Sequence, residues 1–85
     1  MPVVFRHQGI RFHFFSNEGS PREPIHIHAN RNDAEAKVWL VPDIRVVESF
    51  GFTRREQAEL VRIVELRRDE IVRVWHEHFG EGGPL

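Results

Sequence analysis

The sequence contains no cysteine and no tyrosine, and Lys37 is its only lysine. Without cysteine, neither a disulfide nor a thiolate metal site can support the fold, and no thiol nucleophile is available. No apolar run approaches the roughly 18 residues that a membrane-spanning helix needs. No phosphate-cradling glycine motif and no sequence context of a serine catalytic triad is present. These absences leave histidine, carboxylate and lysine chemistry as the candidates.

The charge balance argues against one class of proteins, those that bind nucleic acid by electrostatics alone. The 85 residues include 12 basic and 13 acidic side chains, which gives a net charge of −1. Proteins that hold nucleic acid by electrostatics alone usually carry a marked basic excess. The segment 1–6 lacks the charged-then-apolar layout of a signal peptide. We therefore expect a cytoplasmic protein without a membrane partner.

Alternating apolar residues predict strands in the first half of the chain. Gly9 supplies a hairpin turn, and Ile10, Phe12 and Phe14 share one face, which we expect to be the core face. A loop of turn-forming composition follows at residues 16–23 and is long for so small a domain. Because the later turns are short, the strands favour an antiparallel meander. The expected strands cover residues 3–6, 10–15, 25–29, 34–41 and 44–48.

The second half predicts an amphipathic helix from Thr53 to Gly80. Thr53 and Glu56 have the spacing of a capping box, and Gly80 is a C-cap glycine. Apolar residues fill one half of the helical wheel, interrupted by Arg67 and His78, and we expect His78 to be a core residue. Residues 67–69 could mark a break into two helices with Asp69 as a cap. We favour one helix, because the apolar face stays in phase.

These patterns together predict an α+β fold. An antiparallel β-meander of about four to five short strands is packed by one long C-terminal amphipathic helix. We expect residues 1–80 to form a single domain and residues 81–85 to be a flexible tail.

The segment 24–28 carries the most concentrated chemistry. On a strand, His26 and His28 point the same way, about 6.5–7 Å apart at Cα, so both imidazoles could converge on one metal ion or one anion. A zinc ion would need a third protein ligand, and the available residues are His13, Glu35 and His76. The alternative is that the two imidazoles line a half-exposed strand and bond to neighbours or water.

Lys37 shares a strand face with Glu35 and Trp39. A lysine, a carboxylate and an aromatic ring beside a histidine pair could bind phosphate or support acid–base chemistry. The alternative is a solvated face with a cross-strand ion pair, which we favour slightly. On the helix, His76 and His78 cannot chelate one ion together, because residues two apart differ by 200°. His76, at the border of the apolar face, is the better site candidate, and Arg67 could reach the sheet from the same helix.

Several motifs, in order along the chain, resemble a known bacterial family, domain of unknown function 4160. The resemblance covers about residues 2–79. The motifs are Phe5-Arg6 with Gly9 and Phe12, Phe14-Phe15-Ser16-Asn17-Glu18, Pro24-Ile25-His26-Ile27-His28, Glu35-Ala36-Lys37-Val38-Trp39-Leu40, Gly51-Phe52-Thr53 and Trp75-His76-Glu77-His78-Phe79. The chain departs from the family pattern at His78, where an aromatic residue is expected, and in the longer loop before Pro24.

The resemblance implies a small cytoplasmic protein. Some family members resemble components of two-gene toxin–antitoxin modules and are encoded beside another small domain, which would be the partner protein. A toxin of this kind would act on RNA, with His26, His28 and Lys37 as its acid–base and phosphate-binding groups. The first alternative is a metal-binding domain, with zinc or another divalent ion on His26 and His28. The second is a non-catalytic interaction module that forms homo-oligomers or pairs with its neighbour.

Overall fold

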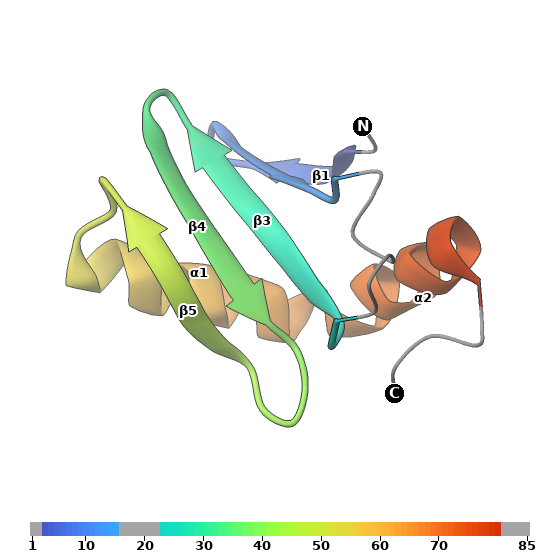
Figure 1. Cartoon of the computed structure of the whole chain (residues 1–85). Coiled ribbons are helices and arrows are strands. Elements are labelled where there is room, and N and C mark those ends of the chain that lie inside the picture. The colour runs from blue at the N-terminus through green and yellow to red at the C-terminus, as the bar shows by residue number, and fades with distance from the viewer. Residues whose placement is uncertain (1–2, 16–22, 81–85) are drawn as a thin grey trace.

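The computed structural model describes residues 3–15 and 23–80 (Figure 1). The expected tail at 81–85 and residues 16–22 of the expected loop lie outside the described residues. Five strands are followed by two helices, which establishes the α+β class. Their bounds are β1 Val3–His7, β2 Ile10–His13, β3 His26–Arg31, β4 Ala34–Trp39, β5 Arg45–Phe50, α1 Arg54–Leu66 and α2 Arg68–Phe79. None of these helices is long and apolar enough to cross a membrane.

The strands form one antiparallel sheet in the order β1-β2-β3-β4-β5, which confirms the predicted meander. The β1–β2 turn places Gln8 and Gly9 at φ 51° and 81°. Positive φ at both central residues is the geometry that tight hairpin turns require, and glycine adopts it without strain. The short turns fix the pairing register, and the register decides which side chains lie next to one another across the sheet.

The core lies between one face of the sheet and the helices. Ile10, Phe12 and Phe14 are buried, as the alternation predicted. Figure 1 shows α1 crossing behind β3, β4 and β5, with α2 beside the start of β3. Trp75 of α2 is fully buried and packs edge-on against Phe14, with ring centroids 5.3 Å apart. Each large apolar side chain buried in this way contributes about 1.5–3 kcal/mol.

The prediction of one long helix is wrong, because the chain forms α1 and α2 with a break at Arg67. Arg67 has φ −106° and ψ 15°, outside the helical region. The capping box at Thr53 and Glu56 is confirmed, with both of its reciprocal hydrogen bonds present. The alternative of a break within residues 67–69 is therefore the correct one, but the N-cap of α2 is Arg67, which makes no side-chain cap hydrogen bond, and Asp69 is not the cap.

The break changes which residues of the second helix face the core. Ile71 and Trp75 are buried, whereas His78 is exposed, so the expected core position of His78 is wrong. A helical wheel assumes 100° per residue throughout, and one non-helical residue rotates everything that follows it. Arg67 does turn inward. Its guanidinium lies 4.1 Å from the centre of the Phe5 ring, and its Nε donates to Glu70 Oε1 at 2.8 Å.

Both edge strands carry an irregularity in their pairing. The register shifts in β1 between Val3 and Phe5, and opposite β5 it shifts between Lys37 and Val38. Val38 pairs with Val46 and Lys37 pairs with Glu48, so Val47 is the extra residue of β5. An extra residue of this kind re-aims the side chains that follow it and disturbs the exposed edge of a sheet.

Candidate functional site

A row of four polar side chains crosses the sheet on the side opposite the helices. His13 on β2 pairs with His28 on β3, His28 pairs with Lys37 on β4, and Lys37 pairs with Glu48 on β5. Residues directly opposite in an antiparallel pair lie on the same face, with Cβ atoms about 4.5–5.5 Å apart. We call these four residues the transverse row and the face that carries them the open face.

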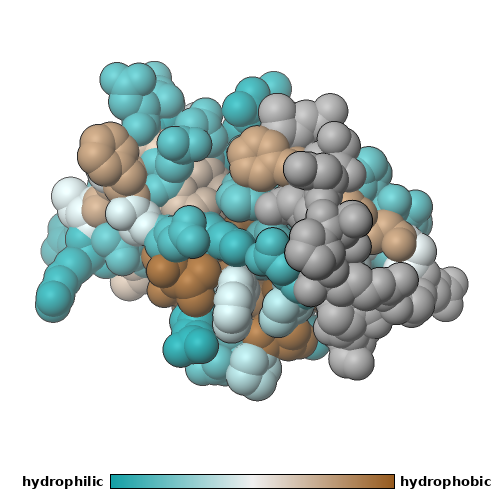
Figure 2. Space-filling model, in the orientation of Figure 1, coloured by the Kyte–Doolittle hydropathy of each residue, from teal (hydrophilic) through white to brown (hydrophobic). Residues whose placement is uncertain are grey.

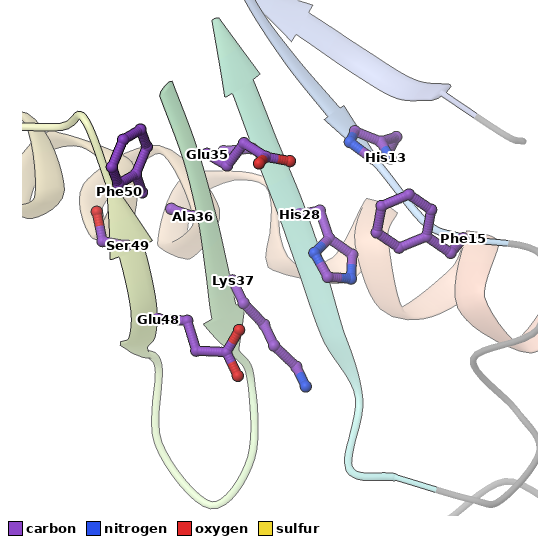
Figure 3. A pocket seen from close by; sticks show the side chains of 10 residues that line it. His13, Phe15, His28, Glu35, Ala36, Lys37, Glu48, Ser49 and Phe50 are labelled. Atoms are coloured by element: carbon purple, nitrogen blue, oxygen red, sulfur yellow. The ribbon is translucent and has the colours of Figure 1, made fainter. Parts of the chain in front are cut away.

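The open face is hollowed around the transverse row. The hollow has a volume of about 310 Å³. In Figure 3, Phe15 and Phe50 stand on opposite sides of it, with His28 and Glu35 between them. Figure 2 views the same face and shows hydrophilic side chains interspersed with apolar ones. The hollow is lined by His13, Phe15, His28, Ala29, Glu35, Ala36, Lys37, Glu48, Ser49 and Phe50.

Lys37 supplies the positive charge of the hollow. Its Nζ donates to Glu23 Oε1 at 2.9 Å, and the Lys37 side chain is 17% exposed against 40% for Glu23. The prediction was a cross-strand ion pair, whereas the ion pair that Lys37 forms is with Glu23, which precedes β3. Glu48, the cross-strand neighbour, extends its carboxylate toward Lys37 in Figure 3. The ammonium group is thus held by Glu23, and Glu48 lies beside Lys37 on the same face of the sheet.

The histidines of the row pack against each other. The rings of His13 and His28 are stacked, with centroids 5.6 Å apart and an angle of 26° between their planes. Phe15 contacts the other part of the His28 ring, at a centroid distance of 4.5 Å. His13 is buried and His28 is half-buried, so only His28 presents much of its ring to the hollow.

His26 lies close to His28 but does not line the hollow. Its ring is 5.2 Å from that of His28 and 5.3 Å from that of Trp75. It is 0% exposed, and its Nδ1 lies 2.9 Å from the carbonyl oxygen of Pro24. The structure therefore brings the predicted pair together on one face of β3, but Trp75 of α2 packs against His26, whereas His28 lies in the hollow.

The predicted third metal ligand is not found among the described residues. No group of three or more His, Asp or Glu side chains within residues 3–15 and 23–80 is arranged to hold a metal ion. His13 lies beside His28, Glu35 lines the hollow, and His76 is on α2 with its Nδ1 3.5 Å from the carbonyl oxygen of Gly80. The geometry of the described residues therefore gives no support to the zinc alternative.

A comparison with family models matches residues 9–76 to Domain of unknown function (DUF4160). The chain belongs to this family. The match confirms the resemblance seen in the motifs and spans β2 to most of α2, so it includes the whole transverse row. No curated protein and no solved structure matched the chain.

The remaining candidate residues of the DUF4160 chain do not line the hollow. Trp39 lies two residues beyond Lys37, on the same face of β4. The Arg45 guanidinium carbon is 5.6 Å from the centre of the Trp39 ring. Arg67 contacts Phe5 on β1, and His76 lies near the end of α2. Of the sequence-predicted residues, His28, Lys37 and Glu35 are thus joined in one site, and Trp39 adjoins it.

Sequence reasoning missed Phe50, Glu48 and Ser49 of the DUF4160 site, and it considered His13 only as a metal ligand. Alternation along β5 could have found Glu48 only if the register with β4 were known. The extra residue Val47 defeats simple alternation, because it puts Arg45 and Glu48 on the same face although they are three positions apart. Phe50 carried a usable signal, since it is a large aromatic residue at the end of a strand.

Proposed function

We propose that this DUF4160 protein binds RNA on its open face, as a component of a two-gene module of the toxin–antitoxin kind. The observation that carries the proposal is the position of Lys37. The only lysine of the chain lies in the middle of the transverse row, beside two stacked histidines and next to a hollow. An ammonium group with imidazoles beside it is a combination that binds a phosphate diester.

Lys37 would provide the main contact to the phosphate. An ammonium group offers three N–H donors, and Glu23 accepts from it in the unliganded protein. Glu23 is more exposed than Lys37, so it can turn to solvent when a phosphate oxygen replaces its carboxylate. The ion pair of the free protein thus holds the lysine in position until the ligand binds.

His28 would act beside the lysine, with His13 behind it. A neutral imidazole can accept the proton of a ribose 2′-hydroxyl, and a protonated one can donate to a phosphate or leaving-group oxygen. Since His28 is the more exposed of the two, it is the histidine placed to touch RNA, and His13 holds its ring by stacking. His13 replaces His26 as the second histidine of the proposed site.

The net charge of −1 fits a site with few phosphate contacts. Each phosphate that a protein neutralises adds about 0.7 to the salt dependence of single-strand binding. We therefore expect micromolar rather than nanomolar affinity for RNA and a shallow decrease of affinity with salt. This behaviour differs from that of strongly basic RNA-binding proteins, which lose affinity steeply.

The test is RNA binding by Lys37→Met, measured by fluorescence anisotropy with a labelled single-stranded RNA at several salt concentrations. We expect a loss of about tenfold and a salt slope lower by about 0.7, the contribution of one phosphate. Arg73→Met is the matched control, because it removes one positive charge from a residue whose partner is Glu77 on the outer face of α2. Equal binding by the two variants, or no RNA binding by the wild type, would overturn the proposal.

A further inference from the structure

We infer that the hollow accepts one unpaired nucleobase, which stacks on Phe50 and donates a hydrogen bond to Glu35. The inference rests on the proposed RNA-binding function and names the part of the RNA that enters the site. It follows from the exposure of Phe50, from the neighbours of Phe50 on the open face and from the distance between Glu35 and Lys37 along β4.

Phe50 is exposed to an extent that the fold does not require. The side chain is 72% exposed, although it lies at the end of β5 and lines the hollow. An aromatic ring that stands on an open sheet beside basic groups is the usual stacking surface for bases of single-stranded nucleic acid. The ring of Phe15 stands at the opposite side of the hollow, against His28, so Phe50 is the ring on which a base would stack (Figure 3).

Glu35 supplies a hydrogen-bond acceptor next to this stacking surface. Glu35 on β4 pairs directly with Phe50 on β5, and in Figure 3 its carboxylate extends over the hollow toward β3. An ionised carboxylate only accepts hydrogen bonds, so it favours bases that present amino groups at their edge. Cytosine, adenine and guanine carry such an amino group, whereas uracil has none, and its single edge donor, N3–H, is flanked by two carbonyl oxygens that a carboxylate repels.

The two halves of the site have the spacing of one nucleotide. The Cα atoms of Glu35 and Lys37, two positions apart on β4, are about 6.5–7 Å apart, and the two charged groups are farther apart because the Lys37 ammonium points away from the Glu35 carboxylate (Figure 3). A phosphate bound at Lys37 and a base bound at Glu35 and Phe50 would then belong to one nucleotide, whose ribose lies along β4. Because a paired base stays within its own helical stack, the hollow can admit only a nucleotide from an unpaired segment.

The test compares Phe50→Ala with Leu66→Ala. Leu66 is 76% exposed and lies at the end of α1, so its change removes a similarly exposed apolar side chain away from the hollow. We expect Phe50→Ala to weaken binding of an oligocytidine about tenfold and Leu66→Ala to leave it unchanged. A duplex of the same length should bind weakly to the wild type, and Phe50→Ala should leave its affinity unchanged. Circular dichroism confirms that both variants fold.

The base preference tests Glu35. Wild type should bind oligocytidine about tenfold more tightly than oligouridine, and Glu35→Gln should abolish this preference, because its amide also offers donors to uracil. If Phe50→Ala and Leu66→Ala bind equally, or if wild type binds cytidine and uridine equally, the inference is wrong. If Lys37→Met still weakens RNA binding in that case, the proposed phosphate contact is retained and only the base pocket is rejected. If no RNA binds, both proposals fall.

Discussion

Glu56 joins the first turn of α1 to the sheet. Its carboxylate accepts a hydrogen bond from the Thr53 backbone N–H at 2.8 Å and pairs with Arg31, at the end of β3. The Arg31 guanidinium also lies 5.4 Å from the centre of the Phe52 ring. The Thr53 contact could be predicted from the capping-box spacing. The Arg31 contact could not, because 25 residues separate the partners and only the folded topology brings them together.

The stability of the protein should depend on pH through this residue. The Thr53 amide, followed by the Arg31 side chain, lowers the pKa of Glu56 below its ordinary value of 4.5. A lowered folded-state pKa contributes stability that is present above pH 4.5 and is lost as the pH falls through the folded-state value. We expect Glu56→Gln, which keeps the capping geometry, to destabilise the protein at pH 7 and much less at pH 3.

Urea denaturation at the two pH values measures this difference. Glu65→Gln, an exposed change on the same helix, is the control and should behave like wild type at both pH values. An equal effect of Glu56→Gln at pH 3 and pH 7 would show that the charge of Glu56 is not the source of the stabilisation.

Among the elements, the strands could be predicted more completely than the helices. Strand order and pairing follow from alternation and short turns, and both were correct. The break at Arg67 could not be read from periodicity, because the apolar positions on either side remain compatible with one straight helix. The contact of the Arg67 guanidinium with the Phe5 ring shows what the break achieves. It places a residue from the helix junction against the edge strand β1.

Two glycines at element junctions offer a matched test of the packing. Gly9 and Gly51 have similar positive φ values, 81° and 85°. A Cβ at Gly9 would have no neighbour within 4 Å, whereas one at Gly51 would lie 3.0 Å from Cα and Cβ of Ala34. We expect Gly9→Ala to cost about 1 kcal/mol for the backbone conformation alone, and Gly51→Ala to cost clearly more.

Thermal or urea denaturation of the two variants measures the difference between them. The additional loss of unfolding free energy in Gly51→Ala, compared with Gly9→Ala, reports how closely the β3–β4 turn packs on the link between β5 and α1. Equal losses would mean that Ala34 moves aside freely, and that the turn is not held against this link.

At the scale of the whole molecule, the two faces of the sheet differ in kind. One is closed by the helices, and the other carries the transverse row and the hollow. The pairing is irregular at both edges of the sheet, in β1 and opposite β5. The sequence predicted Glu35 and Lys37 on one face of a strand by alternation, and it considered them beside the pair His26 and His28 of the preceding strand. It could not predict Phe50 and Glu48, which join the site only through the register of β5.

The proposed function also predicts an effect in cells. Induction of the gene in a bacterial host should slow growth, if the protein acts on RNA as the toxin of its module. His28→Ala should restore growth, whereas His76→Ala should not, because His76 lies on α2 and does not line the hollow. Growth curves with immunoblots for equal expression provide the measurement. Unaffected growth with the wild type, or equal arrest with His28→Ala, would contradict this role.

The two tryptophans lie on different sides of the sheet, and tyrosine is absent. Trp75 is fully buried among aromatic rings, so its emission should report the packing of α2. Trp39 is half-buried on the open face near Lys37, so its emission should respond to whatever binds there. The protein therefore carries its own pair of fluorescent reporters. Trp39→Phe and Trp75→Phe would separate unfolding from ligand binding without any added dye.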